Sequence, residues 1–182
     1  MLRRLLAGYL GLDMGLIQFQ FGNHGKPRLG GNMVGKDLQF NLAQSADMAL
    51  AGFCRGKDIG IDIEQIRPMP DLEQISSKFF SAHEQDQLGD LPEERKLEGF
   101  FTCWTCKEAF IKNLGEGLSY PLSEFDVDFN PKKPTRIANV RSNPQETPNW
   151  QLTCFPVEND YIGAMAVRNM DLCQVQYFSA QV

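Results

Sequence analysis

The longest regular pattern in the sequence is a helix that we predict from about Pro92 to Leu114. Pro92 suits the first position of a helix, and Gly115 suits the residue just beyond its end. Segments with the alternation of strands lie on both sides of this helix, at 59–64 and between 151 and 167. Because hairpins and helices follow one another in this mixed order, the sequence predicts an α+β fold rather than a doubly wound parallel sheet.

Composition narrows the class of protein. The chain has 182 residues, of which 42% are hydrophobic and 23% are charged. This is an ordinary globular composition, and the length suits one domain or two small similar halves that share a core. No apolar run is long enough to span a bilayer, and the apolar start is soon interrupted by Asp13, unlike a secretion signal. We therefore expect a cytoplasmic protein that has no membrane partner.

Charge is distributed unevenly along the chain. Residues 1–57 carry 7 Lys or Arg and 3 Asp or Glu, whereas residues 58–182 carry 11 and 20. A basic first part and an acidic second part can hold a polyanionic small molecule with a cation, although chance variation gives the same pattern. The net charge is −5 and the sequence has no Lys/Arg cluster, so we expect no nucleic-acid partner.

The five cysteines are an odd number with no secretion signal before them, which predicts reduced thiols. Cys103 and Cys106 form a C-x-x-C motif beside Trp104, so a thiol redox site is one interpretation. Such a site needs a helix N-terminus to lower the pKa of its thiol, and this motif lies near the middle of the predicted helix. We therefore interpret both cysteines as core residues.

The segment Ile59–Glu64 places two carboxylates on one face of a strand. Its isoleucines share one face, and Asp62 and Glu64 share the other, about 6–7 Å apart. Neighbouring carboxylates repel each other unless a cation lies between them, and a hard cation such as Mg²⁺ prefers oxygen ligands. The alternative is an exposed face with two solvated acids. We expect this strand to pair with Met48–Cys54 through the turn at 55–58.

Glu108 lies within the apolar stripe of the predicted long helix, about 20° from Leu97 when each residue advances about 100°. A carboxylate in that position is costly unless it is paired or binds a metal. It could complete a three-carboxylate site with Asp62 and Glu64, while Lys107 and Lys112 neutralise phosphate oxygens. The alternative is a weak surface ion pair between Glu108 and Lys112, which the position within the stripe argues against.

Two other segments carry charged residues with weaker signals. Ser81 and Glu84 have the spacing of a capping box, which explains both residues without a function. Lys26 and Arg28 flank Pro27 in a stiff loop that could contact phosphate or a purine. A solvated turn is the commoner meaning of such a loop.

Three short motifs follow one another along the sequence. They are Gly60-Ile61-Asp62-Ile63-Glu64, Phe79-Phe80-Ser81-x-x-Glu84 and Trp104-x-x-Lys107-Glu108-Ala109-Phe110-x-Lys112. A Gly-Lys-Pro loop at 25–27 precedes them. Each motif is weak alone, but in this order and with these gaps the set resembles the 4′-phosphopantetheinyl transferase family, in its larger pseudodimeric, surfactin-type form.

The resemblance implies a fold of two similar α+β halves with the active site between them. Residues 1–57 would form a partial N-terminal half, and residues 58–182 would form the C-terminal half with the metal-binding strand and the W-x-x-K-E-A helix. Family members carry a further N-terminal segment that supplies basic residues to the nucleotide. We therefore expect the first half to be shortened here.

The resemblance implies an enzyme that moves the 4′-phosphopantetheine arm of coenzyme A to a serine of a carrier protein. The carrier would be an acyl, peptidyl or aryl carrier protein, and the other product would be adenosine 3′,5′-bisphosphate. The pseudodimeric type further implies a monomer. The alternative is a non-catalytic relative that binds coenzyme A or a carrier protein without turnover.

The resemblance also implies roles for the candidate residues. Asp62, Glu64 and Glu108 would hold Mg²⁺, or Mn²⁺, against the pyrophosphate. Lys112 and Lys107 would contact pyrophosphate oxygens. These assignments place the metal and the phosphates at the same strand and helix.

Further residues receive roles in substrate binding and proton transfer. Lys26 and Arg28 would lie near the adenosine end of coenzyme A. The proton of the carrier serine would pass to Glu64, to Glu84 or to a metal-bound water. The residues expected to be catalytic are Glu64, Glu84, Glu108 and Lys112.

One departure from the family pattern concerns coenzyme A binding. The family usually reads N-x-S-H-S where this chain has Asn41-Leu42-Ala43-Gln44-Ser45. The family histidine helps to hold a phosphate of coenzyme A. Gln44 can still donate a hydrogen bond to that phosphate, but it carries no charge, so we expect weaker binding of coenzyme A.

Overall fold

The structure is a computed structural model that describes residues 1–22, 24–33, 37–131, 133–158, 160–168 and 175–179. Cys173 lies outside the described residues. The helices are α1 (Leu2–Leu10), α2 (Leu72–Phe79), α3 (Ala82–Gly89) and α4 (Glu93–Leu114). The strands are β1 (Phe19–Phe21), β2 (Pro27–Leu29), β3 (Leu38–Ser45), β4 (Met48–Arg55), β5 (Ile59–Gln65), β6 (Phe125–Asp128), β7 (Arg136–Val140), β8 (Trp150–Val157) and β9 (Tyr161–Arg168). Short 3₁₀ turns lie at Met14–Leu16, Gly31–Met33, Gly117–Ser119, Leu122–Glu124 and Pro144–Asn149.

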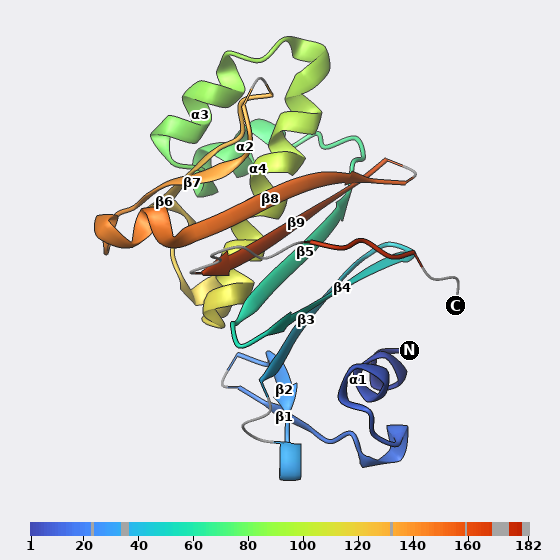
Figure 1. Cartoon of the computed structure of the whole chain (residues 1–182). Helices are drawn as coiled ribbons and strands as arrows, with labels where there is room; N and C mark the ends of the chain where they lie inside the picture. Colours follow the sequence, from blue (N-terminus) through green and yellow to red (C-terminus); the bar gives the residue numbers. More distant parts are fainter. Residues whose placement is uncertain (23, 34–36, 132, 159, 169–174, 180–182) are drawn as a thin grey trace.

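A three-stranded antiparallel sheet in the order β5-β9-β8 lies at the centre of the fold. Helix α4 covers one face of this sheet, and the β3–β4 hairpin covers the other (Figure 1). Helices α2 and α3 and the β6–β7 hairpin pack around the outer side of α4 (Figure 1). This mixed arrangement of helices and sheets confirms the predicted α+β fold.

Helix α4 begins and ends as its sequence predicts. Glu93 and Glu94 lie in its first turn, near the positive end of the helix dipole, and Lys112 lies in the last turn, near the negative end. Gly115 ends the helix in the left-handed conformation, at a φ of 76°. Pro92 is the N-cap, one residue before the helix. The result is a helix of 22 residues that packs along the sheet.

The alternation of β5 divides its side chains between two layers. Ile59, Ile61 and Ile63 pack into an apolar cluster with residues of the β3–β4 hairpin. Asp62 is on the opposite face, where it meets α4. The predicted alternation is therefore confirmed for the three isoleucines and for Asp62.

Strand β5 does not pair with β4, which corrects the hairpin expected from the turn at 55–58. Strand β4 pairs along its full length with β3, from Leu38 opposite Arg55 to Ser45 opposite Met48, whereas β5 pairs with β9. The β4–β5 connection instead folds one sheet onto the other. At Gly52, a Cβ atom would lie 2.4 Å from Cγ1 of Ile61, so the glycine allows this face-to-face contact.

The described residues before β3 form a small layer beside the hairpin. The buried side chains of Leu6, Ile17 and Leu29 make an apolar cluster with Leu38 and Phe40 of β3. Strands β1 and β2 form a separate two-stranded antiparallel pair. The division of the chain into similar halves at residues 57 and 58 stays a prediction. None of the described helices is long and apolar enough to cross a membrane.

Helix α4 approaches β5 closely because residue 60 is glycine. A Cβ atom at Gly60 would lie 1.9 Å from the carbonyl oxygen of Ala109 and 2.3 Å from the backbone nitrogen of Asn113. Both are backbone atoms of the helix, so no side-chain rotation can relieve the overlap. The distance between α4 and β5 is therefore set by this one residue.

We predict that Gly60→Ala lowers the free energy of unfolding by about 3 kcal/mol or more, the upper end of the cost of overpacking. Gly89→Ala is the matched control, because a Cβ atom at Gly89 meets nothing within 4 Å. Urea denaturation of the three proteins measures the difference. Equal stabilities of the two variants would contradict the close approach.

Candidate functional site

Asp62 of β5 and Lys112 of α4 form the ion pair at the centre of the candidate site. The Lys112 Nζ atom lies 2.6 Å from Oδ1 of Asp62, and the Asp62 side chain is 6% exposed. The other carboxylate oxygen, Oδ2, is buried and has no hydrogen-bond partner among the described residues. A buried oxygen without a hydrogen bond costs free energy. A hydrogen-bond donor or a cation that binds Oδ2 would remove this cost.

The three predicted carboxylates act on one another electrostatically. Burial raises the pKa of Asp62 to about 7; Lys112 opposes this rise, and Glu64 and Glu108 add to it. Burial also raises the pKa of Glu108, against the effect of Lys112 and with that of Glu64. The fold therefore brings Asp62, Glu64 and Glu108 into one neighbourhood from β5 and α4.

This neighbourhood suits a hard divalent cation but is not a closed cage. Among the described residues, no three His, Cys, Asp or Glu side chains converge into a ready metal-binding group. Mg²⁺ typically takes only one or two carboxylates and completes its shell with water and substrate phosphates. The unpartnered Oδ2 of Asp62 and the adjacent Glu108 offer ligands of this kind. The donor set therefore fits Mg²⁺ together with a phosphorylated substrate.

Glu64 is held by two residues that the sequence did not single out as site residues. Ser45 donates a hydrogen bond from Oγ to Oε2 of Glu64 at 2.9 Å, and accepts one from the backbone nitrogen of Gln65 at 3.2 Å. The Arg67 guanidinium lies 3.6 Å from the same Oε2. Ser45 is the last residue of the motif at 41–45, which was the available signal. Arg67 carried no comparable signal beyond its spacing from Glu64.

Lys107 and Glu84 form a buried ion pair, which corrects the roles expected for them. Both side chains are 0% exposed, and Lys107 Nζ lies 2.5 Å from Oε1 of Glu84. Lys107 also donates to the carbonyl of Phe125 at 2.9 Å, and the same Oε1 accepts from the nitrogen of Val127 at 2.8 Å. Groups without exposed surface cannot contact a phosphate or a carrier serine, so this pair joins α3 and α4 to β6.

The capping box explains the remaining oxygen of Glu84. Oε2 accepts from the backbone nitrogen of Ser81 at 2.8 Å, and Ser81 Oγ accepts from the nitrogen of Glu84 at 3.3 Å. The capping-box interpretation of these two residues is confirmed. Every oxygen of Glu84 thus has a structural partner.

The two expected nucleotide-binding cations lie at the other end of β5. The Lys26 side chain is 9% exposed and donates to the carbonyls of Ile59 and Asn113. Burial lowers the pKa of Lys26 to about 8, although Asp58 opposes this effect. Arg28 lies 3.4 Å from Asp58 and is 42% exposed, so its guanidinium remains within reach of a ligand.

Gln44 lies exposed near the end of β3, opposite Ala49 of β4. Its amide makes a long contact of 3.5 Å with the carbonyl of Ala46. The following turn is fixed by a hydrogen bond from the Tyr161 hydroxyl to Asp47. The side chain of Gln44 is therefore available to a ligand beside a rigid turn.

The C-x-x-C motif has the properties of core cysteines. Cys103 and Cys106 are both 0% exposed. Burial raises the pKa of the Cys103 thiol well above its usual value, and burial together with a hydrogen bond involving Cys154 does the same for Cys106. A redox site needs an exposed thiol of low pKa, so these observations argue against a thiol oxidoreductase.

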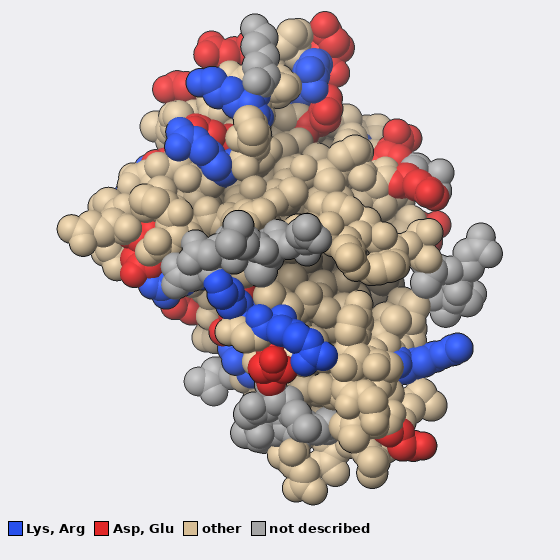
Figure 2. All heavy atoms as spheres, in the orientation of Figure 1, with Lys and Arg blue, Asp and Glu red and all other residues tan. Residues whose placement is uncertain are grey.

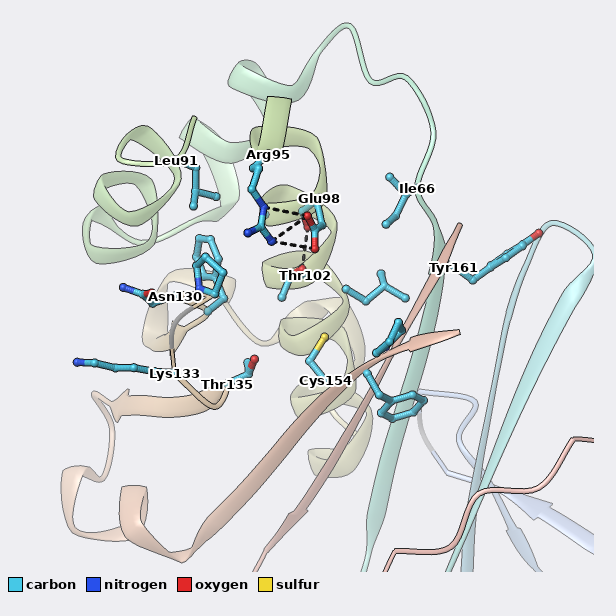
Figure 3. A pocket seen from close by; sticks show the side chains of 16 residues that line it. Ile66, Leu91, Arg95, Glu98, Thr102, Asn130, Lys133, Thr135, Cys154 and Tyr161 are labelled. Carbon is cyan, nitrogen blue, oxygen red and sulfur yellow. Dashed lines mark hydrogen bonds and ion pairs between the residues drawn. The ribbon is translucent and has the colours of Figure 1, made fainter. Parts of the chain in front are cut away.

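A cavity of about 340 Å³ lies between the N-terminal half of α4, residues 129–131, 133 and 135, and the adjoining parts of β8 and β9 (Figure 3). Arg95 and Glu98 of α4 lie side by side at this cavity, joined by hydrogen bonds of 3.0 to 3.2 Å. None of the predicted site residues lines it. The candidate site is therefore defined by the carboxylates of Asp62, Glu64 and Glu108, and this cavity lies elsewhere.

The surface shows a related division of charge. Figure 2 shows many Asp and Glu, together with some Lys and Arg, around α3 and the beginning of α4, and fewer Asp and Glu over the first 57 residues. The sequence imbalance of charge is thus also a spatial one on this face. The candidate carboxylates belong to the acidic part of the chain.

The raised pKa of Asp62 gives a stability change with a defined sign. The folded protein holds the Asp62 proton up to about pH 7, whereas the unfolded chain releases it near the ordinary value of 3.8. Stability is therefore lost as pH rises between these two values and is not lost further above them. We predict that Asp62→Asn, which cannot ionise, becomes progressively more stable relative to the wild type across this window, by up to about 4 kcal/mol.

Urea denaturation at intervals from pH 4 to pH 8 measures this difference. Asp86→Asn on α3 is the control, because Asp86 is exposed. A stability difference between Asp62→Asn and wild type that does not change with pH would contradict the burial of an ionisable Asp62.

Comparisons with known proteins indicate a family for this chain. The model of the 4′-phosphopantetheinyl transferase superfamily matches residues 58–166, which include β5, α4 and all three coupled carboxylates. A holo-[acyl-carrier-protein] synthase from Thermotoga maritima has a similar structure, with a TM-score of 0.50 at 18% identity over 61% of this chain and 62% of that one. This likeness supports the fold.

Sequence relatives cover more of the chain. The 4′-phosphopantetheinyl transferase HetI of Nostoc sp. is 37% identical over 91% of this chain and 67% of its own length. A putative 4′-phosphopantetheinyl transferase of Synechocystis sp. is 32% identical over 87% and 63%. The 4′-phosphopantetheinyl transferase Sfp of Bacillus subtilis is 34% identical over 70% and 54%.

The chain therefore spans about half to two thirds of the length of these curated relatives. The motifs on β5 and α4, the α+β fold and the match over more than half of the residues lead to one assignment. The chain belongs to the 4′-phosphopantetheinyl transferase superfamily.

Proposed function

We propose that this protein transfers the 4′-phosphopantetheine arm of coenzyme A to a serine of an acyl, peptidyl or aryl carrier protein. The observation that carries the proposal is the pair of Asp62 and Lys112, in which a buried carboxylate oxygen of Asp62 has no partner among the described residues and Glu108 acts electrostatically on the same carboxylate. Such a site places a cation ligand and an ammonium group next to each other, which suits a pyrophosphate. The relatives named as transferases support the same reaction.

Asp62, Glu64 and Glu108 are the residues that would hold Mg²⁺, with Mn²⁺ as a substitute. When bound, the ion supplies charge neutralisation at the pyrophosphate and at the leaving group. Asp62 is nearly buried and fixed by Lys112, whereas Glu64 is oriented by Ser45. These neighbours limit the movement of the two ligands before substrate arrives.

Lys112 would neutralise the phosphate oxygens of coenzyme A. Its side chain is 31% exposed, so the ammonium group reaches solvent while it contacts Asp62. As charge builds up on the bridging oxygen of the leaving group, a nearby ammonium stabilises it. Lys107, which is enclosed with Glu84, supports the helix that presents Lys112.

Glu64 is the carboxylate that would accept the proton of the carrier serine. Its side chain is 23% exposed, in contrast to the enclosed Glu84. The serine oxygen forms a bond to the β-phosphorus of coenzyme A, the bond to adenosine 3′,5′-bisphosphate breaks, and the serine proton passes to Glu64. Arg67 and Ser45 hold Oε2, which orients the carboxylate for this transfer.

Arg28 and Gln44 would contact the nucleotide end of coenzyme A. Both are accessible, and both belong to the basic first part of the chain. We further propose a monomer that works in the cytoplasm. The buried free thiols of Cys103 and Cys106 suit a reducing compartment.

A mass-shift assay tests the proposed reaction. The protein is mixed with coenzyme A, Mg²⁺ and a panel of apo carrier proteins, and the carriers are weighed intact. We expect a phosphopantetheine adduct that disappears with EDTA and falls at least about 100-fold in rate with Glu108→Ala, because an electrostatic contact in the transition state is lost. Glu94→Ala, an exposed residue on the same helix, is the control and should retain the rate.

Two results would overturn the proposal. The first is no adduct on any carrier from wild-type protein, and coenzyme A binding under the same conditions would then favour the non-catalytic alternative. The second is an adduct whose rate is the same with and without EDTA, which would exclude the proposed metal-binding role of the three carboxylates.

Gln44 gives a separate prediction about coenzyme A affinity. We expect Gln44→His to tighten coenzyme A binding by about 3- to 10-fold at pH 6 and by less at pH 8, because a charged hydrogen bond to phosphate is stronger than a neutral one. Titration calorimetry at both pH values measures it. Gln20→His, on β1, is the control for a general charge effect. If coenzyme A binds no more tightly at pH 6, residue 44 does not contact a phosphate of coenzyme A.

A further inference from the structure

The ammonium group of Lys26 joins two backbone segments that are far apart in the sequence. Its Nζ atom donates to the carbonyl of Ile59, at the start of β5, at 3.2 Å. It also donates to the carbonyl of Asn113, in the last turn of α4, at 3.1 Å. Only 9% of the side chain is exposed, so these bonds are largely shielded from competing water.

The position of these carbonyls connects Lys26 to the candidate site. Asn113 follows Lys112 directly, and Ile59 lies three residues before Asp62. The two carbonyls are therefore adjacent to the strand and helix segments that carry the central ion pair. We therefore expect a change in the separation of these carbonyls to move Lys112 relative to Asp62.

The end of α4 depends on contacts of this kind. The last four carbonyls of a helix have no partner within the helix, and a lysine near the C-terminus can satisfy them and favour the helix dipole. The side chain of Asn113 adds bonds from Nδ2 to the carbonyls of Asp58 at 2.8 Å and Ala166 at 3.0 Å. Together these contacts tie α4 to both β5 and β9.

The loop that carries Lys26 is fitted to the turn after α4. Gly115 and Gly117 adopt positive φ values of 76° and 59°. A Cβ atom at Gly115 would lie 3.6 Å from Cδ of Lys26, and one at Gly117 would lie 3.4 Å from Cβ of His24. Within the loop, the nitrogen of Gly22 donates to the carbonyl of Lys26 at 3.0 Å. The stem of Lys26 is thus packed, and the ammonium is aimed at the two carbonyls.

The charges around Lys26 make its burial costly. Asp58 lies 3.9 Å from Nζ and is shared with Arg28, whose charge repels the lysine. Burial outweighs the attraction of Asp58, and the pKa of Lys26 is about 8. A lysine that served only to attract a polyanion would remain better solvated.

We propose that Lys26 is a positioning residue, which fixes the last turn of α4 against β5 through Asn113 and Ile59 and so holds Lys112 beside Asp62. This role rests on the proposed function only for its catalytic consequence. It replaces the expected contact of the Lys26 ammonium with the adenosine end of coenzyme A.

The experiment compares Lys26→Met, which keeps an apolar stem, with Lys26→Arg, which restores the donors. Lys57→Met is the matched control, because it removes a lysine charge in the β4–β5 turn and Lys57 makes no hydrogen bond or ion pair within the described part of the chain. Amide hydrogen exchange is measured on all four proteins without coenzyme A or metal. Steady-state kinetics then gives kcat and the KM for coenzyme A.

We expect Lys26→Met to speed exchange about tenfold or more in peptides that cover 110–116 and 58–61, with no change over α1. We expect kcat to fall about tenfold with a KM for coenzyme A within about twofold, because the contact acts on the geometry of the transition state. Lys26→Arg should restore most of both values, and Lys57→Met should resemble wild type. If Lys26→Met does not fold, Lys26→Gln takes its place.

Two results would overturn the positioning role. One is unchanged exchange in both peptides, and the other is a rise in KM with kcat preserved, which would mark a direct contact with coenzyme A. The exchange measurement does not depend on the reaction. If wild-type protein has no transferase activity, the proposed function fails while the exchange data still decide whether Lys26 joins the two segments.

Discussion

The close approach of α4 to β5 at Gly60 is the constraint on which the rest of the structure depends. Because the strand has no side chain there, the helix backbone rests almost directly on it. Asp62 lies two residues after Gly60, on the same face of β5. Its side chain therefore meets Lys112 in the narrow space between the strand and the helix. The same nearness shields Asp62 from water and raises its pKa. Packing and electrostatics of the site therefore have a common origin in one glycine.

Side chains from the first 57 residues contact β5 at its start, in its middle and near its end. Lys26 contacts its start, Asn41 Oδ1 accepts from the nitrogen of Ile61 at 2.8 Å in its middle, and Ser45 contacts Glu64 near its end. These are polar contacts to a strand whose other edge is already paired with β9. The candidate carboxylates all belong to the second part of the chain. Their geometry is nevertheless determined jointly by both parts.

Periodicity allowed part of this arrangement to be predicted. The alternation of β5 placed Asp62 and Glu64 together, and the helical wheel placed Glu108 inside an apolar stripe, because both patterns are local. Pairing and burial are not local. The β4–β5 turn resembled a hairpin although β4 pairs with β3, and Lys107 resembled a phosphate ligand although it is enclosed with Glu84. The bonds of Lys26 to Ile59 and Asn113 join residues 33 and 87 positions apart, which no sequence pattern encodes.

The neighbouring residues Lys107 and Glu108 point in different directions from α4, and this fixes how the helix can lie. Lys107 enters the interior toward Glu84, and Glu108 turns toward Asp62. A slip of the helix by one residue rotates it by about 100° and would bring the carboxylate of Glu108 toward that of Glu84, inside an apolar core. Two like charges there repel strongly in a low dielectric. The buried Lys107 thus fixes the rotation of α4 about its own axis. A packing of α4 rotated by one residue is disfavoured by charge as well as by shape.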